Sequence, residues 1–104
     1  MNKRRLIQEL TNMLAIALRH KIGSIVNPDE IYAQKYAKDA DVLMKEVSRI
    51  SVQKSWSMQD KTKIKDELKN KLKAELERKE FLDNKKFEIM DEEIDRALKL
   101  LNLD

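Results

Sequence analysis

The sequence predicts an all-α protein, a small helical bundle of three long helices and a short C-terminal fourth. Apolar residues recur with helical spacing in each of these stretches. Ala, Leu, Lys and Glu are abundant, and the 104 residues include only one glycine and one proline, which favours helix over strand. Because this length suits one core, we expect a single helical domain over residues 1–104. We expect its first two helices to form an antiparallel hairpin.

The first helix is expected over residues 4–22. Its apolar residues fall on one broad arc: Leu6, Ile7, Leu10, Met13, Leu14, Ala17 and Leu18. The only glycine, Gly23, is expected to end the helix in a left-handed cap. Lys3, Arg4 and Arg5, called the basic arm below, crowd the helix N-terminus, where the macrodipole disfavours cations. Two interpretations stay open for the basic arm: a solvated, frayed end, or contact with an anionic partner.

The second helix is expected from Pro28 to about Ile50. Asn27 is placed to cap it, Pro28 suits its first position, and Asp29 and Glu30 suit its first turn. The expected buried face is Tyr32, Tyr36, Ala40, Leu43, Val47 and Ile50. Ile31 and Val42 lie off this arc, which indicates either a second neighbouring helix or an exposed contact used in oligomerisation. We prefer packing within the chain.

The third helix, in residues 57–82, is the stretch around which we expect the chain to be organised. Four apolar residues at i+4 spacing form a narrow seam: Ile64, Leu68, Leu72 and Leu76. A lysine stands three residues before each, giving the lysine row: Lys61, Lys65, Lys69 and Lys73. This row is a like-charge ladder, which acids on a neighbouring helix or a polyanion would relieve. Ser57 and Asp60 resemble a capping pair at the helix start.

A break over residues 82–86 should precede a short final helix capped by Asp91. The expected buried face of this helix is Ile94, Ala97, Leu98 and Leu101, which leaves Leu100 and Leu103 partly exposed. The predicted core of the bundle is Leu6, Leu10, Leu14, Tyr36, Leu43, Val47, Ile64, Leu68, Leu72, Ile94 and Leu98.

No catalytic, cofactor-binding or metal-binding motif occurs in the sequence, so we do not expect an enzyme. The only histidine, His20, is expected in the last turn of the first helix, where it suits the dipole rather than catalysis. Cysteine is absent, which excludes disulfides and cysteine zinc sites. The most apolar run, Met13–Leu18, is too short to span a bilayer. Without a secretory signal, the expected location is the cytoplasm.

The sequence therefore favours a protein-interaction or assembly module that binds a protein partner or another copy of itself. Residues 1–26 carry five basic and one acidic group, and residues 91–104 carry two basic and five acidic groups. These ends can attract each other within or between chains. The candidate interaction residues are the lysine row, Lys61, Lys65, Lys69 and Lys73, and the basic arm, Lys3, Arg4 and Arg5. The alternative is a nucleic-acid-binding protein that uses the lysine row.

Overall fold

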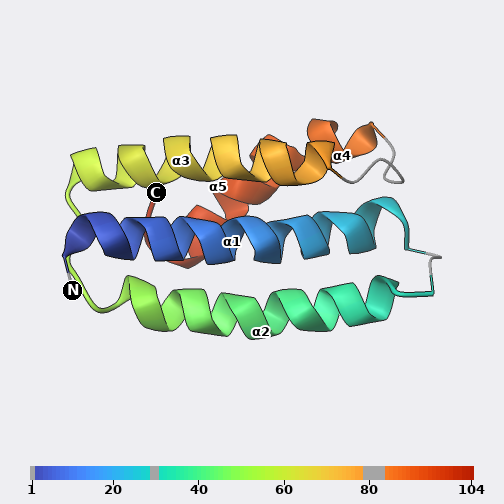
Figure 1. The fold of residues 1–104 in the computed structure, drawn as a ribbon, viewed down its shortest axis with the longest axis horizontal. Coiled ribbons are helices and arrows are strands. Elements are labelled where there is room, and N and C mark those ends of the chain that lie inside the picture. The colour runs from blue at the N-terminus through green and yellow to red at the C-terminus, as the bar shows by residue number, and fades with distance from the viewer. Residues whose placement is uncertain (1, 29–30, 79–83) are drawn as a thin grey trace.

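The chain forms an up-and-down helical bundle (Figure 1). A computed structural model describes residues 2–28, 31–78 and 84–104. Within them lie helices α1 (Lys3–Val26), α2 (Ala33–Ser51), α3 (Met58–Glu77), α4 (Lys85–Glu88) and α5 (Met90–Leu100). The fold class is confirmed: three long helices, the first two forming an antiparallel hairpin, precede a short C-terminal one. The single turn of α4 is an addition to the prediction.

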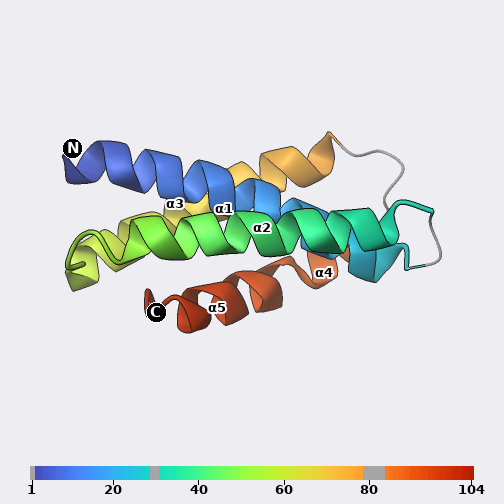
Figure 2. The ribbon, with the colours of Figure 1, turned by 90° about the horizontal axis from the view of Figure 1, so that it is seen from below.

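The central element is α1, not α3. Figure 1 shows α2 and α3 on opposite sides of α1, and Figure 2 shows α5 against one face of this layer. In the described part of the chain, the backbone of α2 approaches neither α3 nor α5 closely. The expectation that α3 organises the chain was therefore wrong. The physical reason is the width of the apolar arcs. The broad apolar arc of α1 can pack against several neighbouring helices, whereas the narrow seam of α3 can pack on one side only.

The start and the seam of α3 agree with the prediction. The Ser57 hydroxyl accepts a hydrogen bond from the Asp60 backbone N–H (3.1 Å), and the Asp60 carboxylate accepts one from the Ser57 N–H (3.0 Å). This capping box satisfies two backbone donors at the helix end. All four seam residues are fully buried: Ile64, Leu68, Leu72 and Leu76.

The boundary between α1 and α2 differs from the prediction. Gly23 is buried inside α1 and has no positive φ, so it is not a left-handed cap. The helix continues because Ile22 and Val26 extend the apolar stripe of Leu18 at i+4 spacing. Asn27 then ends α1, and its backbone N–H donates to the Gly23 carbonyl (3.1 Å).

The second helix starts later than predicted. Pro28 lies in a turn, and α2 begins at Ala33 after Tyr32, whose side chain makes no capping hydrogen bond. Asn27 and Pro28 therefore do not open this helix. The predicted first-turn acids, Asp29 and Glu30, lie outside the described residues.

The buried face of α2 is also narrower than predicted. Ala40, Val47 and Ile50 are buried as expected. Tyr36 and Leu43, both placed in the predicted core, are only half-buried. Tyr32, Ile31 and Val42 are exposed, so the preference for intramolecular packing of the last two was wrong. One neighbour explains these differences, because within the described residues α2 packs on α1 alone, and such a helix buries one narrow face.

The C-terminal part departs from the prediction in the expected break and at the start of the final helix. The expected break contains α4, and Lys86 is buried there, whereas Leu82 and Asp83 lie outside the described residues. Asp91 lies in the first turn of α5 and not at its cap, which is Ile89.

The chain end closes with a turn that the sequence did not reveal. Asn102 has φ 58°, and the Leu103 N–H donates to the Leu98 carbonyl (2.8 Å). This is the Schellman arrangement, which turns the chain back over its own helix. Leu103 is buried as a result, contrary to prediction, whereas Leu100 is 74% exposed.

Candidate protein-interaction site

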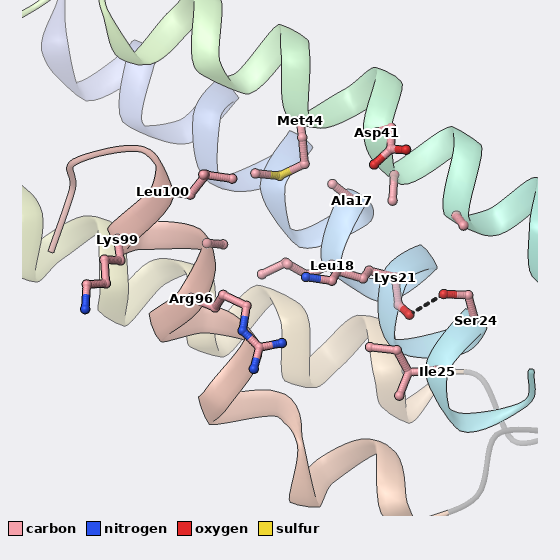
Figure 3. Close-up of a pocket in the computed structure, with 13 residues that line it drawn as sticks. Ala17, Leu18, Lys21, Ser24, Ile25, Asp41, Met44, Arg96, Lys99 and Leu100 are labelled. Atoms are coloured by element: carbon pink, nitrogen blue, oxygen red, sulfur yellow. Dashed lines mark hydrogen bonds between the residues drawn. The ribbon is translucent and has the colours of Figure 1, made fainter.

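A pocket of about 640 Å³ opens between α2 and α5, over α1. We call it the α2–α5 pocket (Figure 3). Its floor includes Ala17 and Leu18 of α1. The α2 side carries Ala37, Ala40 and Met44, and the α5 side carries Ala97 and Leu100. The side chains of Met44 and Leu100 point toward one another from the two sides (Figure 3). The lining is therefore mainly apolar and is contributed by three helices.

The pocket lies between two helices that both pack on α1, while α5 alone of the two also packs on α3 in the described residues. Small residues on α2, among them Ala33 and Ala40, are buried, which lets that helix approach its neighbour α1 closely. On the other side, α5 packs on α1 and α3. Lys65 Nζ lies 3.2 Å from Asp95 Oδ1, and Lys69 Nζ lies 3.5 Å from Asp91 Oδ1. Since the backbones of α2 and α5 do not approach each other closely in the described residues, the space between them stays open.

A buried carboxylate orders two of the cations that line the pocket. Glu93 has a side chain only 4% exposed, and its Oε1 accepts a hydrogen bond from Arg96 Nη1 (2.9 Å). Its Oε2 lies 2.8 Å from Lys21 Nζ, as an ion pair without hydrogen-bond geometry. Arg96 also donates to Glu92 (2.8 Å). Charge-assisted contacts of this kind fix side-chain positions, so Lys21 and Arg96 have defined places at the pocket.

Two further charges stand on opposite sides of the pocket. Asp41 of α2 and Lys99 of α5 both line it, and both are exposed. Neither makes an ion pair with another residue in the described ranges. The two sides of the pocket therefore offer unpaired charges of opposite sign, beside an apolar centre.

The structure divides the predicted lysine row. Lys65 and Lys69 contact the acids of α5, so the like-charge ladder is relieved within the chain. Lys61 is half-buried and lines a smaller cavity of about 320 Å³ between α3, α5 and the C-terminus. Lys73 is exposed and has no ion pair with any described residue. The two central lysines of the row, Lys65 and Lys69, thus hold α5 in place.

The basic arm is also partly engaged within the chain. Lys3 Nζ lies 2.8 Å from Asp60 Oδ2 and 5.9 Å from the centre of the Trp56 ring. The hydrogen bond from Lys3, together with that from the Ser57 backbone, lowers the pKa of Asp60 to about 2. The Trp56 indole N–H donates to the Ser51 carbonyl (2.7 Å). Arg4 and Arg5 are exposed.

His20 lies well inside α1 and not in its last turn, because the helix runs on to Val26. Its ring packs against Tyr36, with the ring centres 5.4 Å apart, and its Nε2 lies 3.2 Å from Arg19 Nη2. Across the described ranges, no group of three or more histidine, aspartate or glutamate side chains could hold a metal ion. None of the helices described is both long and apolar enough to cross a membrane.

Sequence reasoning missed the α2–α5 pocket. Its available signals were Leu100, left over from the buried face of the last helix, and the alanines of the second helix, such as Ala37 and Ala40. Neither signal indicates a pocket until the distance between α2 and α5 is known. Comparison with protein families, with curated proteins and with solved structures gave no match.

Proposed function

We propose that the protein is a non-enzymatic helical interaction module whose α2–α5 pocket receives a helix from another polypeptide. The observation that supports this proposal is an apolar pocket of about 640 Å³ between two helices whose backbones do not approach each other closely in the described residues. An amphipathic helix laid into an apolar groove is a recurring mode of peptide recognition, with anchors at i, i+3 or i+4, and i+7.

A helix suits this pocket better than a small molecule does. The volume alone is typical of small-molecule sites. However, the pocket is bordered by Leu100 and Ile25, which are 74% and 44% exposed. A small molecule on the floor would leave these side chains in water, whereas a helix lying across the opening would cover them and gain their burial.

The charges at the pocket define how such a helix would lie. Its apolar face would contact Ala37, Met44 and Leu100. An acidic residue on one flank would pair with Lys99 on the α5 side, and a basic residue on the other flank would pair with Asp41 on the α2 side. The partner is therefore an amphipathic helix with opposite charges on its two flanks.

Selection from a library of helical peptides tests this proposal. Peptides that bind the wild-type protein should share apolar anchors at helical spacing, with acid on one flank and base on the other. The variant Ala37→Trp fills the pocket from its exposed side and should abolish their binding. Ala74→Trp, at an exposed alanine of α3, is the matched control and should leave binding unchanged.

Two results would contradict the proposal. One is a selection that yields no binders at all. The other is a set of binders whose affinity is the same for wild type and Ala37→Trp, because such peptides would occupy another face. Circular dichroism of both tryptophan variants checks that the helices are intact.

A further inference from the structure

We infer that the α2–α5 pocket faces the same pocket of a second copy of this chain, so that α5 of each copy lies against α2 of the other in a symmetric dimer. The inference rests on the proposed function, and it names the partner. It is carried by the self-complementary pocket, in which an unpaired Asp41 and an unpaired Lys99 stand on opposite sides with the exposed Leu100 beside them.

Self-complementarity follows from the arrangement of these groups. In a two-fold dimer the same patch is used twice, so each contact between a first and a second residue is repeated with the roles exchanged. A two-fold axis running along the pocket brings α2 of one copy opposite α5 of the other. Asp41 of each copy then meets Lys99 of its partner, giving two ion pairs.

The apolar groups match in the same arrangement. The pocket brings Met44 and Leu100 together from its two sides (Figure 3), and α2 and α5 run in the same direction (Figure 1). Rotation about the pocket axis therefore places Leu100 of one copy at the level of Met44 of the other. Each copy covers the apolar side chain that the other leaves exposed, which is the main gain expected on association.

Charge exchange between copies tests the inference directly. Asp41→Lys alone would place two lysines opposite each other at both contacts of a dimer, and Lys99→Glu alone would place two acids opposite each other at both contacts. Each single variant should therefore be monomeric at 12.3 kDa where the wild type is dimeric. An equimolar mixture of the two variants places opposite charges at both contacts and should restore the dimer.

The readout is sedimentation equilibrium over a concentration series that reaches about 1 mM, since a small interface gives weak association. Leu100→Asp should weaken dimerisation more than about tenfold, because it puts a charge where an apolar side chain is buried. Val42→Asp is the matched control, as Val42 is also exposed (62%) but does not line the pocket.

Each outcome decides between the inference and its competitors. A dimer that the single charge variants break and their mixture restores supports the inference. A wild-type protein that stays monomeric over the whole series overturns it, as does a dimer that is indifferent to Leu100→Asp. In the monomeric case, peptide selection still tests the proposed function, because peptides that Ala37→Trp rejects would show the pocket to be a site for a different partner.

Discussion

The helices α2 and α3 pack on opposite sides of α1, but they do so in different ways. α3 buries four large side chains completely, begins with a capping box, and is joined to α1 by the Arg19–Glu75 ion pair (2.7 Å). α2 has no side-chain cap, and Val47 and Ile50 are its only large apolar residues buried in the described structure. The difference between the two sides indicates that the buried α3 seam contributes more to stability, whereas the α2 side leaves more apolar surface exposed.

The largest loss of folding stability is expected from a charge placed inside the α3 seam. Leu68→Asp would bury an unpaired carboxylate at a fully buried position, so the chain should not fold, and circular dichroism should show the loss of cooperative melting. The neighbouring exposed change Asn70→Asp is the control and should melt like wild type. A folded Leu68→Asp protein would contradict the claim that the buried seam of α3 is needed for stability.

Truncating one leucine on each side sharpens the comparison. Leu72→Ala removes a fully buried side chain of α3 and should lower the free energy of unfolding by about 2–5 kcal/mol. Leu43→Ala removes a half-buried side chain of α2 and should cost about half as much or less. Urea unfolding measures both. Equal losses would mean that α2 contributes to the core as much as α3 does.

The cap of α3 should make stability depend on pH in the acid range. Because the pKa of Asp60 is lowered from 3.8 to about 2 in the folded chain, the charged form favours folding. This contribution is complete above about pH 4 and is lost as the pH falls toward 2. The melting temperature of Asp60→Asn should therefore lie below that of wild type at pH 7 and converge with it near pH 2. A difference that does not vary with pH would contradict this role.

The smallest loss of stability is expected from changes in the ion pairs that hold α5. Lys65→Glu would place a carboxylate beside Asp95, and both side chains are more than half exposed, so we expect a loss of about 1 kcal/mol or less. The double change with Asp95→Lys should restore most of it, and high salt should reduce the difference. Failure of the double change to recover stability would show that this pair does not hold α5 in place.

The stable side of the molecule is also the part that the sequence predicts well. The seam of α3 has one strict spacing, and its Ser57–Asp60 cap is a local signal, so neither depends on the rest of the fold. The α1–α2 boundary was misjudged because Gly23 and Asn27 carry local capping preferences that burial of Ile22 overrides. The pocket could not be predicted, because it depends on the distance between α2 and α5, which no periodicity encodes.

The measurement that tests the division between the two sides most directly is a dilution series of amide NMR spectra of the wild-type protein. As concentration rises, we expect shift changes confined to the two sides of the α2–α5 pocket, in residues 37–44 and 96–100, with the α3 seam unchanged. Changes centred on the lysine row of α3 would contradict the account, since they would place the contact surface on the side assigned to stability.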